Sequence, residues 1–453
     1  MSGLSTAQVL SLDSCVMLAM KSNKEIQAAQ HMVSQYQHTQ KSLYANYFPN
    51  ISLNATDVYS TQNFTSMMDI ASPIGAYVGQ QVQDLLPRLV DDAMRQHLAQ
   101  DVTYALKPLN PDISYKFKNL FNASISLEQP IYMGGKISTA NRMGKLGVKL
   151  ARKAEQLSRE EVIVQVYDAY QLVVKAKAMH VVAVRYDSLL NQIGRDVESA
   201  VKHGMASHND ELKVTVKKND AELKMRQAEN GIILAKMNLC QLIGMPLNAV
   251  IDVEEEKNPD FLGLIDKNAQ VTNRTEYELL DLKTRLAQEK VKLEQSEYRP
   301  QLGVMLNAGV MDGMEILGNK MFKHKANLTV GATLKIPLFH AGETRQKVAA
   351  AKEELAQERL KQEDLAGKMN LDLQQQANIV DEARLELKLR KRNLEQCEEN
   401  LRISRKSYSV GMETLSEVLT AQLLWQQAYA ELVESRYQAK VKMMKWRKAA
   451  GRL

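Results

Sequence analysis

The sequence predicts a mainly α-helical protein built from a few very long helices, with a smaller portion of β-strands. Two features of its composition lead to this prediction. The 453 residues contain only 10 Pro and 21 Gly, so few turns interrupt the chain. Aromatic residues make up 6% of the chain and charged residues 25%, so most of its length can bury only a narrow apolar stripe. These proportions are typical of long amphipathic helices, and they disfavour both disorder and a compact multidomain α/β enzyme.

Composition also argues against several other classes of protein. The three cysteines, Cys15, Cys240 and Cys397, are widely spaced and odd in number, so they indicate neither a disulfide framework nor a CxxC-type zinc site. The chain contains no run of about 18 apolar residues, so no membrane-spanning helix is predicted. The net charge is +6, and the basic residues are mixed evenly with acidic ones along the chain. This pattern indicates a solvated surface and no nucleic-acid partner. The first residues contain no apolar signal core, so we expect any export signal to have been removed from this sequence.

An internal repeat gives the third indication of the fold. The segment from Pro130 to Lys136 recurs from Pro337 to Glu343, an offset of 207 residues. The same offset carries Gly204-Met205 onto Gly411-Met412. Two distant landmarks that share one offset mean that the segments between them have equal lengths, so the chain is a tandem duplication.

The repeat sets the expected domain boundaries. Upstream, Pro49 recurs as Pro300 at an offset of 251, so the first copy carries 44 extra residues between its two prolines. We expect a first repeat at 1–245, an inter-repeat segment at 246–274 that belongs to an equatorial belt, and a second repeat at 275–453.

Each repeat contains a long helical hairpin. We expect the hairpins at 136–243 and 343–449, turned by Gly204 and Gly411 respectively. The first arm of each has 68 residues without proline, and such a stretch forms roughly 100 Å of helix at about 1.5 Å per residue. Apolar residues in these arms follow coiled-coil spacing, in steps of seven from Val380 to Tyr408, so both arms need neighbouring helices.

Four segments with a period of two lie at the far end of the hairpins from these glycines. We expect strands at about 50–60, 120–132, 301–311 and 326–339. Each has one apolar and one polar face, and about ten residues is the length of a tilted strand that crosses a bilayer. The prolines expected at the junctions between the strands and the helices are Pro49, Pro130, Pro300 and Pro337.

The apolar face of these strands permits two interpretations. A soluble, half-buried sheet is the common interpretation of a single alternating strand. Four strands cannot enclose a core, however, and no other segment offers enough apolar surface to cover them, so a lipid-facing sheet is favoured. Because four strands are too few for a water-filled barrel, several subunits would have to contribute to one closed sheet.

The loop between the first two strands, about 61–118, carries the 44 extra residues. Its apolar residues from Val82 to Met94 follow helical spacing. If the helices lie in the periplasm, this loop lies outside the cell. Two roles stay open for it, a cap that narrows the barrel mouth and a plain surface decoration.

Several motifs resemble those of the TolC-type outer-membrane efflux proteins. They are the Tyr-x-x-Gly turn from Tyr408 to Gly411, followed by Thr414-Leu415 and Val418-Leu419, the Pro-Leu-Phe-x-x-Gly junction from Pro337 to Gly342, and the tandem repeat itself. The resemblance covers about Ser11 to Met444. It implies a homotrimer in which three chains build one twelve-stranded outer-membrane β-barrel, with four strands per chain, continued by a long α-helical tunnel in the periplasm.

The resemblance also implies a gate at the periplasmic aperture. The gate tyrosine of the family matches Tyr408, the acidic partner on the first hairpin matches Asp210, and an inner acidic constriction residue matches Glu417. The family's basic latch residue falls on Glu413, and a second constriction acid falls on Thr420. Asp210 and Glu413 would repel each other, so a latch of the usual sign is not expected here. Three copies of Glu417 would still form a negative ring that favours cations.

Partners and a function follow from the same resemblance. It implies that a periplasmic adaptor docks at the hairpin tips, around Gly204-Met205 and Gly411-Met412, and connects to an inner-membrane transporter. The expected function is the exit duct of a tripartite efflux pump in the outer membrane. A type I protein secretion duct and a soluble trimeric coiled-coil scaffold are the alternatives. No catalytic constellation, metal-ligand cluster or cofactor motif stands out, so we expect no enzyme, metal or cofactor.

Overall fold

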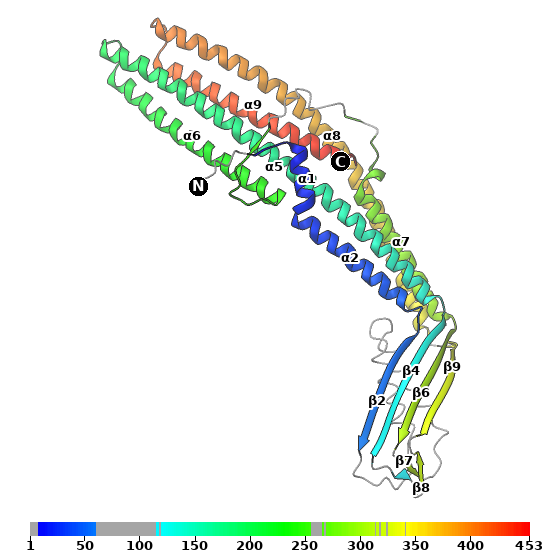
Figure 1. Ribbon diagram of the computed structural model, residues 1–453. Coiled ribbons are helices and arrows are strands. Elements are labelled where there is room, and N and C mark those ends of the chain that lie inside the picture. The colour runs from blue at the N-terminus through cyan, green and yellow to red at the C-terminus, as the bar shows by residue number, and fades with distance from the viewer. Residues whose placement is uncertain are drawn as a thin grey trace. The chain divides into compact units, whose positions relative to one another are not determined.

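Figure 1 presents the computed structural model, which describes residues 8–59, 115–116, 119–254, 265–266, 269–312, 314–316, 319–322, 325–339 and 341–453. The chain divides into a helical unit and a sheet unit, so the predicted class, mainly helical with a smaller strand portion, is confirmed. The helical unit comprises Met1–Lys41, Ala140–Lys292 and Gln346–Leu453, and the sheet unit comprises Ser42–Thr139 and Leu293–Arg345.

Two helices dominate the helical unit. They are α5 (Lys136–Lys202) and α8 (Glu343–Ser409), with 67 residues each. Each turns at its end into a shorter helix that runs back beside it, α6 (His208–Ile243) after α5 and α9 (Leu415–Ala449) after α8 (Figure 1). The remaining helices described in this unit are α1 (Leu12–Ser22), α2 (Lys24–Ala45) and α7 (Thr275–Gln295).

Side-chain contacts fix the order of the helices. In the half that contains α6 and α9 the order is α6–α5–α9–α8, and in the half that contains α2 and α7 it is α2–α5–α7–α8 (Figure 1). Thus α5 is internal in both halves, whereas α8 lies at an edge in both. The contacts are Val214 against Gly194, Tyr437 to Asp168 at 2.8 Å, Arg390 to Glu431 at 2.5 Å, Gln40 to Asn141 at 3.1 Å, Lys153 to Glu278 at 2.5 Å and Lys290 to Glu354 at 2.5 Å.

Two local features of the helical unit lie outside the sequence prediction. Helix α1 ends just before Asn23, whose side chain accepts a hydrogen bond from the N–H of Glu25 at 2.9 Å and donates one to the carbonyl of Leu242 at 3.2 Å. The first bond caps α2, and the second ties the break to the end of α6. The other feature is a parallel pair of short strands, β1 (Gln8–Leu10) and β5 (Ile251–Val253).

The sheet unit contains a four-stranded antiparallel sheet in the order β2–β4–β6–β9. A smaller sheet in the order β3–β7–β8 lies in the same unit. The strands of the larger sheet are β2 (Asn50–Tyr59), β4 (Asn119–Met133), β6 (Gln301–Asp312) and β9 (Lys325–Lys335), and those of the smaller are β3 (Tyr115–Lys116), β7 (Met314–Ile316) and β8 (Asn319–Phe322).

The four junction prolines mark strand ends in different ways. Pro49 and Pro300 directly precede β2 and β6. Pro130, expected to leave the sheet, lies inside β4 at an irregularity in its pairing with β6. Pro337 follows β9, which ends at Lys335, four residues before the predicted end at 339. Proline has no N–H to donate to a strand partner, which accounts for both the irregularity and the early end.

The register gathers the apolar residues of all four long strands on one face. Side chains directly across the sheet alternate between an apolar row and a polar row. Two neighbouring apolar rows are Ile51–Leu127–Leu306–Val330 and Leu53–Ile125–Ala308–Leu328, and the polar row between them is Ser52–Ser126–Asn307–Thr329.

Some predicted segments lie outside the residues that the structure describes. The insertion expected at about 61–118 lies outside the described residues except for β3, and so do residues 255–264 of the inter-repeat segment. Among the described residues, no helix has both the length and the apolar character needed to cross a membrane.

Candidate functional site

The two helical hairpins turn in the same way at their tips. Gly204 and Gly411 both adopt the left-handed conformation, with φ of 73° and 75°. In each tip the glycine N–H donates to the carbonyl three residues earlier, and the N–H of the following methionine donates to the carbonyl five residues earlier. This pattern satisfies the last carbonyls of the long helix and requires a positive φ, which explains the glycine at both positions.

A capping box starts the helix after each tip. The hydroxyl of Ser207 accepts from the N–H of Asp210 at 3.2 Å, and the carboxylate of Asp210 accepts from the N–H of Ser207 at 3.3 Å. Thr414 and Glu417 make the same two bonds at 3.4 and 2.6 Å. Asp210 and Glu417 are separated by the repeat offset of 207, so they occupy equivalent positions of the two hairpins.

These hydrogen bonds lower the pKa of both carboxyl groups. For Asp210 the main cause is the hydrogen bond from the ammonium of Lys213, at 2.9 Å, followed by the hydroxyl of Ser207. For Glu417 the main cause is the backbone N–H of Thr414, followed by the hydroxyl of the same residue. Both groups therefore carry their negative charge at neutral pH.

Tyr408 lies at the end of α8 against an apolar cluster that joins the two hairpins, and its side chain is half-buried. Burial raises the pKa of its phenol, and the charges of Asp210 and Asp196 raise it further. The structure therefore brings Tyr408 of the second hairpin within electrostatic reach of Asp210 of the first. The buried members of this tip cluster are Ile193, Val197, Val214, Leu415 and Val418.

Glu413 and Thr420 make contacts within their own hairpin. The hydroxyl of Ser404 donates to the carboxylate of Glu413, and the hydroxyl of Thr420 donates to the carbonyl of Ser416 at 2.8 Å. Among the described residues no hydrogen bond or ion pair connects Glu413 with Asp210. The structure thus places the two acids with separate partners.

Apolar side chains project from both tips. Met205 is 78% exposed and Met412 is 82% exposed, and each directly follows the left-handed glycine of its turn. Methionine side chains are flexible and polarisable, so an exposed pair of them suits a contact surface for another protein.

The apolar face of the long-stranded sheet is open. The side chains of Leu53 on β2 and Leu328 on β9 are 74% and 68% exposed, although they belong to one continuous apolar row. Exposed aromatic residues lie at both ends of the strands. Tyr47, Phe48, Tyr132 and Tyr298 lie at the end near the junction prolines, and Tyr59 and Phe121 lie at the other end.

Both units have unpartnered edges. Among the residues that the structure describes, β2 and β9 each have a neighbouring strand on one side only. In the helical unit, Leu385 and Ile403 of α8 are exposed, and each lies two residues after a buried residue, hence about 200° around the helix from the core. Helix α6, at the other edge, has a similar stripe. The exposed large apolar residues are Leu212, Val216, Leu223, Ile233 and Leu234 on α6 and Leu360, Leu365, Leu371, Leu385, Leu389 and Ile403 on α8.

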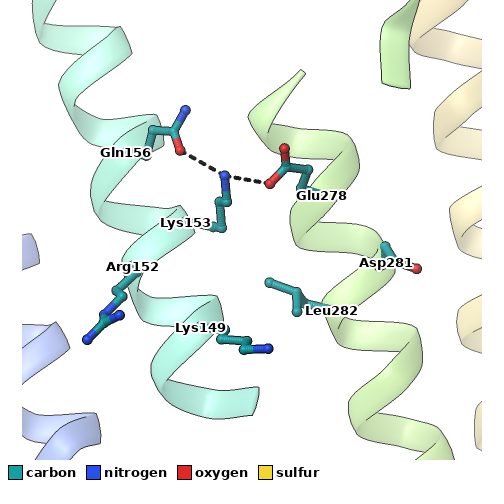
Figure 2. A pocket seen from close by; sticks show the side chains of 7 residues that line it. All are labelled: Lys149, Arg152, Lys153, Gln156, Glu278, Asp281 and Leu282. Atoms are coloured by element: carbon teal, nitrogen blue, oxygen red, sulfur yellow. Dashed lines mark hydrogen bonds and ion pairs between the residues drawn. The ribbon is translucent and has the colours of Figure 1, made fainter. Parts of the chain in front are cut away.

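A pocket between α5 and α7 is lined mainly by charged side chains (Figure 2). The ammonium of Lys153 bridges the amide of Gln156 at 3.0 Å and the carboxylate of Glu278 at 2.5 Å. Among its described lining residues there is no serine, cysteine or histidine that could act as a nucleophile. The ion pair between Lys153 and Glu278 joins the first repeat to the second. Its lining residues are Lys149, Arg152, Lys153, Gln156, Glu278, Asp281 and Leu282.

Comparison with known proteins identifies a family that part of the chain resembles. Residues 280–452 match the family model described as outer membrane efflux protein. This part of the chain is similar to that family. The predicted resemblance is therefore confirmed. Among curated proteins, none matches the chain significantly.

Solved structures of outer-membrane proteins share the fold of this chain. The outer membrane protein VceC from Vibrio cholerae is 14% identical, with a TM-score of 0.74 over 97% of this chain and 96% of that one. The outer membrane channel CmeC from Campylobacter jejuni is 16% identical, with a TM-score of 0.73 over 97% and 85%. The outer membrane channel MtrE from Neisseria gonorrhoeae, in its open state, is 12% identical, with a TM-score of 0.71 over 97% and 88%.

Two features of the hairpins escaped the sequence reasoning, although each has a signal in the sequence. The capping boxes are visible as Ser-x-x-Asp from Ser207 and Thr-x-x-Glu from Thr414, directly after a glycine turn. They make Asp210 and Glu417 structural equivalents, whereas the sequence argument gave them different roles. The second apolar stripe of α8 is visible in the spacing of Leu371 and Leu385 and of Leu389 and Ile403, since the members of each pair are two heptads apart.

Proposed function

We propose that three copies of this chain form an outer-membrane channel that is the exit duct of a tripartite efflux pump. A periplasmic adaptor and an inner-membrane transporter would deliver small molecules to it. The observation that carries the proposal is an exposed apolar face on a four-stranded sheet with two unpaired edges. The match of residues 280–452 to the outer membrane efflux protein family supports it.

Lipid is the environment that suits the apolar face. In water, the exposed side chains of Leu53 and Leu328 would forgo about 25 cal/mol for each Å² of apolar surface left unburied. The 10 residues of β2 span roughly 33 Å, which crosses an apolar layer of about 25 Å when the strand tilts by about 40°. The exposed aromatic residues at both strand ends match the two headgroup levels of such a layer.

Three copies would remove the open edges of the sheet. If β9 of one copy pairs with β2 of the next, the 4 strands of each chain give a closed ring of twelve and no edge strand is left. Twelve strands are enough for a water-filled pore, whereas four are not.

The same symmetry would cover the edge helices. The apolar stripe of α8, with Leu385 and Leu389, would pack against the stripe of α6, with Val216 and Leu223, on a neighbouring copy. Three helical units would then form a tube whose tips lie at one end, in the periplasm. A single threefold arrangement accounts for the open edges of both units.

The aperture of this duct would lie at the tips. The fixed charges of three Asp210 and three Glu417 side chains would make it negative and favour cations. Glu413 and Thr420 would lie on the same rim. To open the aperture, the hairpins would have to separate at the tip cluster. This separation would break the contact that Tyr408 makes with the cluster.

The adaptor would dock on the outside of the tips. There the exposed methionines Met205 and Met412 provide apolar contact area, and the turns at Gly204 and Gly411 give both hairpins the same shape. An adaptor could therefore bind the two hairpins of one chain in a quasi-equivalent way.

Two other functions are alternatives. A type I protein secretion duct would use the same architecture, and the cargo of the transporter distinguishes it from a drug efflux duct. A soluble coiled-coil scaffold would leave the apolar sheet face in water, which disfavours it. We assign no reaction and no cofactor to the chain.

Planar bilayer recordings test the channel. We expect the purified protein to give discrete conductance steps. Leu328→Lys puts a charge on the apolar face and should abolish insertion, because lysine at the bilayer midplane costs about 2–4 kcal/mol per chain. The neighbouring Thr329→Lys, on the polar face, should still insert and should lower the preference for cations. Equal behaviour of the two variants would contradict the membrane orientation of the sheet.

A further inference from the structure

The two repeats have the same strand register. Within the first repeat Ile51 of β2 lies opposite Leu127 of β4, and within the second Leu302 of β6 lies opposite Leu334 of β9. The repeat offsets of 251 and 207 residues carry the first pair onto the second. The equivalence of the two repeats therefore extends to individual pairs of residues across the sheet.

The pair of β4 and β6, which joins the two repeats, is staggered. Glu128 lies opposite the first residue of β2, but on its other side it lies opposite Met305, four residues after Gln301, where β6 begins. The stagger gives the end of β4 a neighbour, and this strand continues past Pro130 to Met133. A neighbouring strand thus carries β4 past a proline, although proline has no N–H to donate.

The equivalent end of β9 lacks such a neighbour. Strand β9 ends at Lys335, and residues 336–339 pair with no strand that the structure describes. Phe339 is 84% exposed, whereas its equivalent Tyr132, which pairs with Leu302 of β6, is 46% exposed. The first repeat thus shows what the second repeat is missing, a strand beside the end of β9.

The free edge of β2 is exposed in the same way. Leu53 is 74% exposed, whereas its equivalent Val304 of β6, which has a strand on both sides, is 36% exposed. The contrast continues at the glycines that follow β4 and β9. A Cβ added to Gly135 would lie 3.4 Å from the guanidinium of Arg299, and one added to the equivalent Gly342 would meet no atom of the described residues within 4 Å.

We propose that β9 of one copy pairs with β2 of the next in the register that joins β4 to β6, which sets Lys335 opposite Asn54 and Phe339 opposite Ile51. The proposal rests on the proposed function, because it specifies the interface that closes the twelve-stranded barrel. Residues 336–339 become the last part of β9, as their equivalents are the last part of β4, and no free edge is left beside them.

This register keeps the two faces of the sheet apart. It sets Leu334 opposite Ala55 on the apolar face and Lys335 opposite Asn54 on the polar face. A slip by one residue would place apolar side chains of one copy beside polar side chains of the next, so it is disfavoured.

A register with aligned strand ends is the main alternative that keeps the faces. It would set Lys335 opposite Asn50, as in the pairs inside each repeat, and would leave the apolar side chains of residues 336–339 without a neighbouring strand. Stagger, strand tilt and diameter are linked in a closed barrel, so the staggered register gives the more tilted strands and the wider pore.

The equivalence ends at the junction beyond the strands. A Cβ added to Gly134 would lie 2.5 Å from the carbonyl oxygen of Ser296, so the junction inside the chain has no room for a side chain there. The equivalent residue of the second repeat is Ala341, which has a Cβ and a φ of 46°. The junction between copies would therefore have to be wider, and the register carries over only as far as Phe339.

Disulfide cross-linking in outer membranes tests the register. The full chain carries Lys335→Cys with Asn54→Cys or with Asn50→Cys, together with Cys397→Ser, because the other two native cysteines are completely buried. Residues directly opposite have Cβ atoms about 4.5–5.5 Å apart, whereas positions 50 and 54 lie about 14 Å apart along β2. Copper phenanthroline should link the Asn54→Cys protein into covalent dimers and trimers on a denaturing gel, and this linkage should be lost in the Asn50→Cys protein. Variants with only one of the new cysteines should give no linked chains.

A second pair guards against a variant that does not assemble. Ile336→Cys with Leu53→Cys lies in the same register and should also be linked. Linkage of Lys335→Cys through Asn50→Cys, and not through Asn54→Cys, would overturn the register. So would the absence of linkage in both proposed pairs while native mass spectrometry finds three chains. Single chains of the wild-type protein would instead contradict the proposed function.

Discussion

The carboxylates of Asp210 and Glu417 accept hydrogen bonds from backbone N–H groups at the start of α6 and α9. A carboxylate that caps a helix is held in one place, because its displacement would leave those N–H groups without a partner. In the proposed trimer the same groups lie at the aperture. We therefore expect the charges of the aperture to move with the helices and not to swing across the opening independently.

The lowered pKa of Glu417 predicts how its cap depends on pH. A carboxyl group whose pKa is depressed in the folded state contributes stability above its ordinary value of 4.5, and this contribution is lost as the pH falls through the lowered pKa. The start of α9 should thus stay protected from hydrogen exchange at pH 5 and lose protection in stronger acid. Glu417→Gln keeps the acceptor but does not titrate, so its protection should not change over this range. Hydrogen exchange of the segment 411–418, corrected for intrinsic exchange rates, measures this protection. The same loss of protection in the wild type and in Glu417→Gln would contradict the cap.

At the scale of elements, glycine has opposite effects at the tips and within the long helices. Gly411 has a φ of 75° and Gly367 lies in the interior of α8, and an added Cβ would meet no atom within 4 Å at either position. The difference between the two positions is therefore confined to the backbone. A left-handed conformation is unfavourable for alanine, whereas a helical one is favourable.

This contrast gives a matched pair of substitutions. Gly411→Ala should destabilise the tip by about 1–2 kcal/mol, and Gly367→Ala should stabilise α8 by about 0.5–1 kcal/mol. Denaturant unfolding monitored by circular dichroism measures both changes. If the two variants shifted stability in the same direction, the left-handed turn at Gly411 would be contradicted.

The long elements could be predicted because their signals are local. Scarce proline, seven-residue spacing and terminal glycines predicted α5, α6, α8 and α9, and alternation predicted the four long strands. The pair β1 and β5 could not be predicted, since three residues per strand carry no period and their pairing joins distant segments. The break at Asn23 depends in the same way on a tertiary contact, its bond to Leu242. The end of β9 at Lys335 was placed too late because the alternation continues past the last paired residue.

The candidate site was predictable in position but not in its contacts. The repeat and the family resemblance located the tips and selected Tyr408, Asp210 and Glu417. That Asp210 is held by Lys213 and Ser207, and Glu413 by Ser404, depends on side-chain geometry at the turn. A sequence argument about the repulsion of Asp210 and Glu413 could not anticipate these separate partners.

At the scale of the whole molecule, each unit has two edges that are incomplete in one copy. In the sheet these are β2 and β9, and in the helical unit they are α8 on one side and α6 and α2, in successive halves, on the other. Within the described part of the chain each unit thus lacks a partner at both of its edges, and a ring of copies is the arrangement that satisfies all of them with a single kind of interface.

A substitution on the α8 stripe tests this interface. Leu389→Asp places a charge in the proposed contact with α6 of the next copy and should shift the assembly towards single chains. Lys391→Asp, an exposed residue on the other side of α8, serves as the control and should leave the assembly intact. Size-exclusion chromatography in detergent distinguishes the two results. An unchanged assembly of Leu389→Asp would remove this stripe from the interface.

The number of chains in the particle tests the central claim most directly. Native mass spectrometry of the protein, extracted from the outer membrane and released from detergent micelles, counts them. The proposed twelve-stranded closure requires three chains, since each contributes four long strands. A particle of three chains is the predicted result, and a folded particle of one, two or four chains would contradict the account.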